Sequence, residues 1–239
     1  MMDHEIKHYR KIAKEIQKIL NWTVTGKCNK CNRKIMEDLF EVIAGEHNFP
    51  NRNKWWCPEC TLSRKDKVDE TPPSGLLEYL QNASYPTDMQ MDIDVYKKAF
   101  LDGYCHLEYY IIINKEDYVT PDYAFLTDLS SSALRLFIAL ELFLQQTVKN
   151  RLSGSKREEK IAIFLLEKVR PNLDEYILML KTLGYALGKS IRDPLYPCQE
   201  IRNKIVHKGY YPSIKEVTLM FEAVGKFIAY VENAVIKEE

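Results

Sequence analysis

Three polar residues near the carboxyl end of the chain, Arg202, Asn203 and His207, have complementary chemistry. A histidine titrates near neutral pH and can act as a general base or a general acid. An arginine stays charged, and its planar guanidinium can bond two phosphate oxygens at once. An asparagine amide can fix the histidine tautomer or bond a phosphate. Together they could move protons at the 2′-hydroxyl and the leaving 5′-oxygen of RNA and stabilise the phosphorane, without a metal.

Helical geometry limits how Arg202 and His207 can meet. Five residues of a helix advance by about 140° beyond a full turn, so the two would not share one face of a straight helix. Gly209 and Pro212 end the predicted helix just after His207. We therefore expect His207 in the last turn or just beyond it, where its ring can turn toward the guanidinium. The structural alternative is an arginine paired with an acid and a histidine that only caps a helix end.

The segment Arg202-Asn203-x-x-x-His207, followed by Gly-Tyr-Tyr-Pro and a long terminal helix, resembles the HEPN family (higher eukaryotes and prokaryotes nucleotide-binding). The resemblance implies a helical bundle and a metal-independent endoribonuclease for single-stranded RNA, with Arg202, Asn203 and His207 as its catalytic residues. Active members work as dimers in toxin–antitoxin, antiviral defence and RNA-processing systems. The resemblance therefore also implies RNA as a partner, a homodimer and, in toxin-type systems, a neutralising partner protein.

Glu141 and Tyr210 are the two supporting residues that the resemblance suggests. The family often has an acidic or polar residue on an earlier helix in contact with the motif, and Glu141 stands within an apolar helix. Its other interpretation is a partly exposed surface glutamate. The toxin branch has a tyrosine two residues after the histidine, but Gly209 occupies that position here and Tyr210 follows it. A non-catalytic module of the same fold, used for RNA binding or dimerisation, is the alternative from another class.

Four cysteines in two Cys-x-x-Cys pairs predict one structural zinc ion per chain, with Cys28, Cys31, Cys57 and Cys60 as ligands. Zinc takes four tetrahedral donors, and each pair presents two thiolates on a small turn. Two pairs fill the coordination sphere and leave no position for a substrate. Paired cysteines of this kind suit a reducing compartment better than a disulfide framework, so we expect a cytoplasmic protein.

The segment from Gly45 to Cys60 also resembles, faintly, the HNH endonucleases, in which a catalytic histidine and an asparagine lie near paired zinc knuckles. His47 and Asn53 would then carry the chemistry. The gap from His47 to Cys57 is short for that family, and Thr61 stands where histidine or asparagine is usual. An HNH-type endonuclease is therefore the lesser alternative.

The spacing of apolar residues predicts that most of the chain around these candidate residues is helical. The expected helices cover 5–20, 93–111, 130–152, 156–170 and 173–187, then a short helix after Pro194 and Pro197 and a capped helix from Ser213. We predict a mainly α fold, a HEPN-like helical bundle preceded by a small four-cysteine module. Its parts are an N-terminal amphipathic helix (1–22), a zinc-ribbon-like module (23–70), a linker (71–90) and the bundle (91–239).

Two helix faces, one apolar and one charged, can each be interpreted in two ways. The terminal helix carries a seam spaced by four and three residues, which suits the bundle core or a dimer contact: Val217, Phe221, Val224, Ile228, Val231 and Val235. The N-terminal helix carries a basic stripe, which suits a solvated face or a nucleic-acid contact: Lys7, Lys11, Lys14 and Lys18.

Charge and hydropathy exclude other classes. Lys+Arg and Asp+Glu both count 34 among 239 residues, so the net charge is zero and any nucleic-acid contact must be local. No stretch is apolar and long enough to span a bilayer, and the first residues lack a signal-peptide core.

Overall fold

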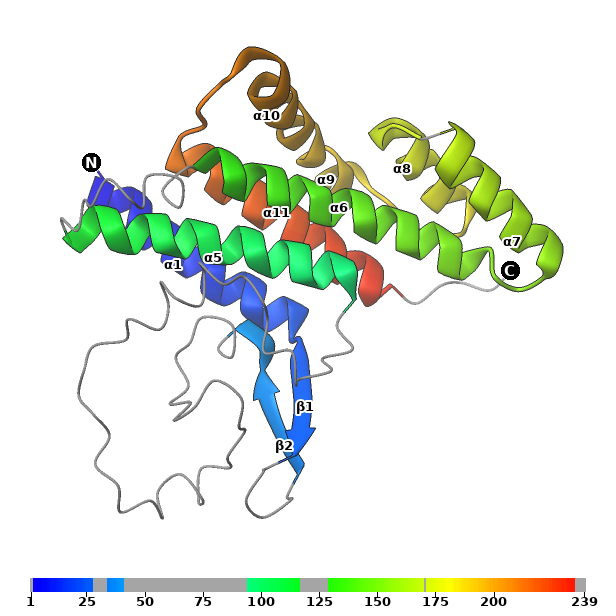
Figure 1. The fold of residues 1–239 in the computed structure, drawn as a ribbon, viewed down its shortest axis with the longest axis horizontal. Coiled ribbons are helices and arrows are strands. Elements are labelled where there is room, and N and C mark those ends of the chain that lie inside the picture. The colour runs from blue at the N-terminus through cyan, green and yellow to red at the C-terminus, as the bar shows by residue number, and fades with distance from the viewer. Residues whose placement is uncertain (1, 28–33, 41–93, 117–128, 170, 235–239) are drawn as a thin grey trace. The chain divides into compact units, whose positions relative to one another are not determined.

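A computed structural model describes residues 2–27, 34–40, 94–116, 129–169 and 171–234. The chain divides into two compact units, one formed by Met1–Leu20 with Asp94–Glu239 and the other by Asn21–Ile93. The predicted mainly α fold is confirmed, because helices make up nearly all of the described part of the first unit (Figure 1). Within the described ranges, no helix combines the length and the apolar character needed to cross a bilayer.

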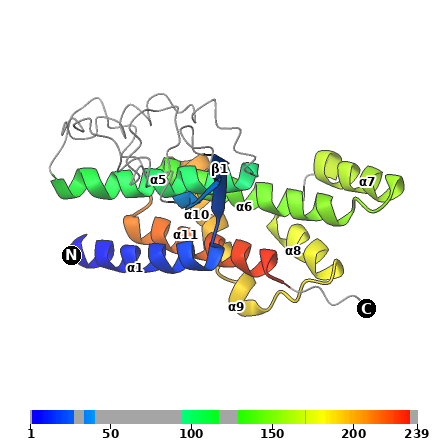
Figure 2. The same ribbon diagram turned by 90° about the horizontal axis from the view of Figure 1, so that it is seen from below.

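The helical unit is built around three long helices that pack together. Helix α5 (Val95–Glu116) packs along α6 (Leu129–Arg151), and α11 (Ile214–Glu232) packs against α6, α5 and the N-terminal helix α1, Met2–Leu20 (Figures 1 and 2). Shorter helices follow α6: α7 (Lys156–Ile163), the π-helix η2 (Phe164–Val169), α8 (Leu173–Thr182), α9 (Lys189–Arg192) and α10 (Leu195–Lys208).

An aromatic cluster joins three of these helices at the core. The ring of Phe221 on α11 stacks on Phe100, with centroids 5.0 Å apart, and on Tyr104 at 5.7 Å. Tyr9 of α1 meets the same ring edge-on at 6.1 Å. The described part of the α11 seam is buried within the unit, so it forms bundle core rather than a dimer contact: Val217, Phe221, Val224, Ile228 and Val231.

Helix α1 belongs to this bundle, whereas the sequence suggested that it was a separate N-terminal segment. Its apolar face is buried, with Ile16 fully inaccessible. A close approach to α11 makes this possible, because a Cβ placed on Gly225 would lie 2.6 Å from Cγ2 of Ile16. The bundle is therefore assembled from both ends of the described chain, and residues 21–93 are inserted between its first two helices.

Local signals set the helix ends. The predicted capping box of α11 is present, with the Glu216 amide donating to Ser213 Oγ at 3.3 Å and the Ser213 amide donating to Glu216 Oε2 at 2.8 Å. Helix α8 ends at Thr182, five residues before the predicted end at Leu187. Gly184 takes a φ of +90°, and Tyr185 donates its amide to the Leu180 carbonyl at 3.0 Å. This Schellman turn stops the helix.

The second unit contains a β-hairpin in its described part. Strands β1 (Thr23–Lys27) and β2 (Lys34–Asp38) pair antiparallel, from Thr23 opposite Asp38 to Lys27 opposite Lys34. Beyond the pairing, the Trp22 and Phe40 rings stack with centroids 5.8 Å apart, and the Leu39 amide donates to the Trp22 carbonyl at 2.9 Å. The hairpin is thus closed at the end where its strands join the flanking chain.

Candidate functional site

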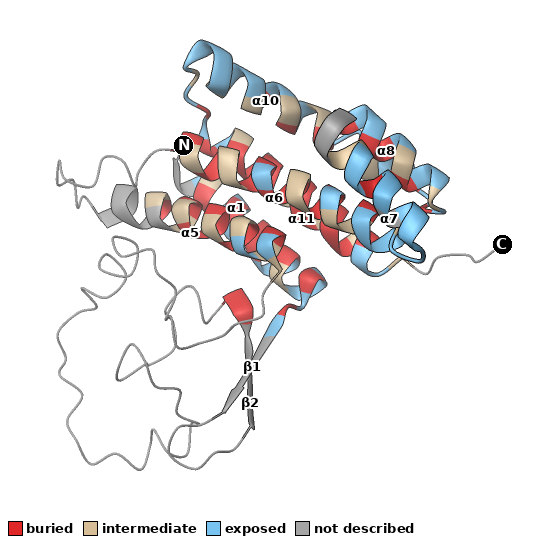
Figure 3. Ribbon diagram, turned by 45° about the vertical axis from the view of Figure 1, so that its right-hand side comes forward, coloured by how far each residue is buried: buried red, intermediate tan, exposed pale blue. Residues whose placement is uncertain are grey.

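Helix α10 carries the predicted motif and is mostly exposed over its second half (Figure 3). The helix begins after Pro194, and Pro197 lies in the first turn, where a missing amide proton costs no helical hydrogen bond. Its end is fixed by Gly209, whose φ of +60° is left-handed and whose amide donates to the Ile205 carbonyl at 3.2 Å. His207 therefore lies in the last turn, as the sequence predicted.

Arg202 lies against helix α6. Its guanidinium carbon is 5.7 Å from the centroid of the buried Phe137 ring, a cation–π arrangement. Glu141, one turn further along α6, is close enough to feel the same charge. Burial raises the pKa of Glu141 above its ordinary value, and the nearby Arg202 charge opposes that shift without cancelling it. Glu141 thus lies near enough to Arg202 for their charges to interact, and its supporting role stays a prediction.

Asn203 and His207 are exposed beyond this anchored arginine. Arg202 Nη1 donates a 3.0 Å hydrogen bond to Oδ1 of Asn203, which leaves the amide nitrogen of Asn203 facing solvent. Among the interactions of the described residues, none joins His207 to Arg202, Asn203 or Glu141. The helical rotation of about 140° keeps the histidine and the guanidinium apart, so the expected turn of the ring toward Arg202 does not occur within one chain.

Tyr210 holds the turn after α10. Its hydroxyl donates to Glu216 at 3.0 Å, and Lys204 Nζ lies 5.8 Å from the centroid of its ring. Burial alone would raise the pKa of Glu216, but hydrogen bonds from Ser213 and Tyr210 together with the Lys204 charge lower it. The hydrogen bond to Glu216 in turn raises the pKa of Tyr210. Tyr210 thus stabilises the start of α11 and contacts Lys204, but no interaction among the described residues joins it to Arg202, Asn203 or His207.

The surface around His207 is basic with apolar edges. Lys204 and Lys208 are exposed on the same helix, where the helix C-terminus favours cations. Val206 and Tyr211, on either side of His207 in the chain, are 51% and 80% exposed. An extended polyanion could lie across such a surface, and its apolar edges could be covered by another protein surface.

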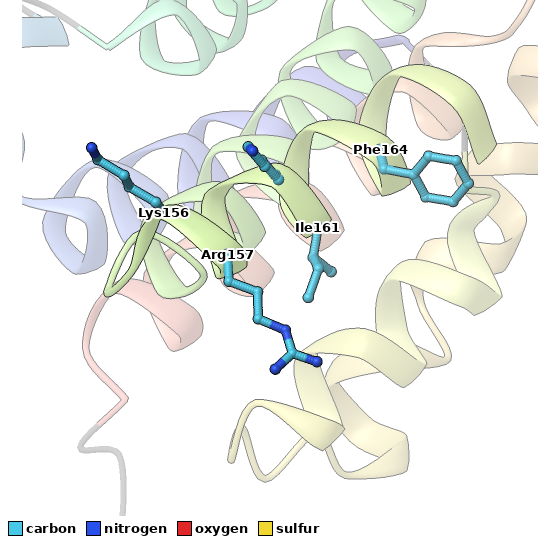
Figure 4. A pocket seen from close by; sticks show the side chains of 5 residues that line it. Lys156, Arg157, Ile161 and Phe164 are labelled. Carbon is cyan, nitrogen blue, oxygen red and sulfur yellow. The ribbon is translucent and has the colours of Figure 1, made fainter.

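A separate hollow of about 530 Å³ lies along α7 and the start of η2. Three cations and two apolar side chains line it, as Figure 4 shows: Lys156, Arg157, Lys160, Ile161 and Phe164. None of the predicted site residues lines this hollow. The motif on α10 is therefore an exposed surface, which suits a polymer better than a small enclosed ligand.

The predicted zinc ligands Cys28, Cys31, Cys57 and Cys60 lie outside the described residues, and so do His47 and Asn53. Lys27 and Lys34, the described residues that flank the first pair in the sequence, lie opposite each other in the β1–β2 hairpin. Across the described ranges, no three histidine, cysteine or acidic side chains form a metal-ligating group.

Phe137 is a residue of the site that sequence reasoning missed. It precedes Glu141 by four positions, so the two share one face of α6. The four-residue spacing from Glu141 could have identified Phe137 from the sequence.

No family model matches the chain, and neither a curated protein nor a solved structure does. The function is therefore argued from the α10 site itself.

Proposed function

We propose that this chain is a metal-independent endoribonuclease of the HEPN type, which cuts single-stranded RNA by attack of the 2′-hydroxyl on the adjacent phosphate. The main support is the arrangement on α10, where Arg202 packs on the Phe137 ring of α6 near Glu141 and bonds Asn203, while His207 is exposed in the last turn of the same helix. Each group needed for the reaction is present on one helix end, and none of them is buried away from a polymer substrate.

The side chains divide the work in this proposal. His207 exchanges a proton with the 2′-hydroxyl or the leaving 5′-oxygen. Arg202 stabilises the charge that develops on the phosphorane. Asn203, hydrogen-bonded through its oxygen to Arg202, offers its amide protons to a phosphate oxygen. Phe137 and Glu141 act through Arg202 and position it.

The proposal includes a homodimer, because one chain does not bring His207 to Arg202. A two-fold pair formed at the α10 end would place two motifs in one cleft and would cover the exposed Val206 and Tyr211. A specific interface of this kind buries at least about 1,200 Å² in total.

RNA cleavage by the purified full chain tests the function. We expect a mixed RNA pool to be cut in EDTA, DNA to be spared, and the products to end in 2′,3′-cyclic phosphates. Arg202→Ala and His207→Ala should each slow cleavage by roughly 10²–10³, which is typical for the loss of one positioned charged donor. Arg192→Ala is the matched control, because this arginine pairs with Asp193 on α9. Wild-type activity in His207→Ala would refute the proposal.

Two other outcomes would identify the alternatives. The separation of His207 from Arg202 within one chain favours a non-catalytic RNA-binding or dimerising module, which would bind RNA without cutting it. Cleavage that depends on added Mg²⁺ and acts equally on DNA would instead indicate an HNH-type endonuclease that uses His47.

We also propose one structural zinc ion held by Cys28, Cys31, Cys57 and Cys60. The donor set suits zinc, and Lys27 and Lys34, which flank the first cysteine segment in the sequence, pair with each other in the β1–β2 hairpin. Metal analysis of the purified chain should find about one zinc per chain. Cys57→Ser should lose the zinc, whereas Cys198→Ser, a change at a buried cysteine of α10, should keep it. Metal-free wild-type protein would contradict the assignment.

A further inference from the structure

Five cations occupy the outward face of α1: Lys7, Arg10, Lys11, Lys14 and Lys18. All five are exposed. At 3.6 residues per turn they fall within an arc of about 100° and extend about 16 Å along the helix axis. Among the residues of α1 whose burial is described, the exposed acid is Glu15, which lies at the edge of the arc and is paired with Lys226 of α11 at 3.2 Å. The face is therefore a concentrated strip of positive charge.

This charge is unbalanced within the described chain. No acidic side chain of the described residues pairs with any of the five. Several of them stand four positions apart, where like charges on a helix repel and destabilise it. The chain as a whole has no net charge, so the strip is a local concentration and not a consequence of a basic composition. A bound polyanion would remove the repulsion.

The opposite face of α1 decides which polyanion fits. A basic amphipathic helix binds a membrane by burying its apolar face among the lipids. Here that face is already used, because Tyr9 packs on Phe221 and Ile16 fits against Gly225 of α11. Ile19, at 36%, is the large apolar residue of α1 that stays exposed. The part of α1 that stays available to a partner is its positively charged face, which suits a phosphate backbone.

We propose that the α1 basic strip binds the phosphate backbone of RNA. The choice of RNA over another polyanion rests on the proposed function. The concentration of positive charge on α1 does not depend on that function. The strip contacts phosphates without reading bases, so it raises the affinity for any RNA strand that reaches α10. Each phosphate contact on a single strand contributes about −0.7 to the slope of log K against log salt concentration.

Binding of a labelled 20-nucleotide oligouridine, followed by fluorescence anisotropy across a KCl series, tests the strip. His207→Ala serves as the background so that RNA stays intact. In that background, Lys7→Gln, Lys11→Gln and Lys14→Gln together should weaken binding at least about tenfold at low salt and flatten the slope by about 2. The matched control changes three exposed lysines on other helices, Lys149, Lys181 and Lys189, to Gln and should stay within about twofold.

The readouts separate this proposal from the catalytic one. RNA binding that falls only in the α1 variant supports the strip, even if the unmodified chain never cuts RNA. Cleavage by the unmodified chain together with unchanged binding in the α1 variant would overturn the strip alone. Vesicles containing phosphatidylserine form the second arm. If they bind the chain through the same lysines while oligouridine does not, the strip is a membrane contact and the proposal fails.

Discussion

The guanidinium carbon of Arg202 lies 5.7 Å from the centroid of the Phe137 ring, so the motif on α10 is tied to the long helix α6. A cation over an aromatic face gains about 0.5–2 kcal/mol, depending on how far it is desolvated. Phe137 is itself buried and cannot move freely. The direction of the arginine is therefore set by the core of the bundle as well as by its own helix.

Phe137→Leu tests this coupling. The change keeps an apolar side chain in the core but removes the ring face, so RNA cleavage should fall about fivefold, while the melting temperature changes little. Phe143→Leu is the control, since Phe143 is equally buried on α6 but packs on Tyr96 and Phe227. Equal loss of cleavage in both variants would show that general core packing, and not the contact with Arg202, is responsible.

Glu141 should make stability depend on pH. Burial raises its pKa in the folded chain, so the folded state holds this proton at pH values where the unfolded state has released it. The free energy of unfolding should therefore fall as pH rises from the ordinary glutamate value of about 4.3 through the raised one. Glu141→Gln should lack this fall. Urea unfolding of both proteins between pH 3.5 and 7 measures it, and identical pH profiles would contradict the prediction.

Gly225 should tolerate no side chain. A Cβ there would lie 2.6 Å from Ile16 Cγ2 and 3.2 Å from Phe100 Cζ, and both neighbours are fully buried. Gly225→Ala should cost about 1–3 kcal/mol of unfolding free energy, despite the better helix propensity of alanine. Gly188→Ala, where nothing lies within 4 Å of the new Cβ, should stay within about 0.5 kcal/mol. A stabilised Gly225→Ala protein in urea unfolding would mean that α1 and α11 are not in close contact.

Light scattering tests the proposed dimer. The chain should elute with twice its monomer mass at micromolar concentration, and the double change Val206→Glu with Tyr211→Glu should return it to a monomer that no longer cuts RNA. Leu178→Glu introduces the same charge at a 64% exposed position on α8 and should leave the dimer intact. A wild-type chain that stays monomeric yet cuts RNA at full rate would exclude a composite site.

Strong local patterns explain which elements the sequence predicted well. Helix α6 was expected at 130–152 and spans Leu129–Arg151, and α11 begins at the predicted capping box. The position of His207 in the last turn followed from Gly209 and Pro212, and Gly209 does end the helix with a left-handed φ. The predicted end of α8 at Leu187 was wrong. Gly184 and Gly188 are equally good local signals for a helix end, and the burial of Tyr185 and Leu187 in the bundle favours the end at Gly184. The direction of Arg202 depends on α6, which lies far from it in the sequence.

The parallel packing of α1 on α11 joins the first and last described helices of the chain, as the contact of Ile16 with Gly225 shows. A ribosome makes α1 before α11, so the surface that covers the apolar face of α1 emerges only after the whole segment between the two helices. During synthesis this helix must therefore stay uncovered or find a temporary partner, which exposes it to aggregation and to chaperones. For a helical bundle, such distant contacts also predict slow folding, because closure of a long loop precedes the final packing.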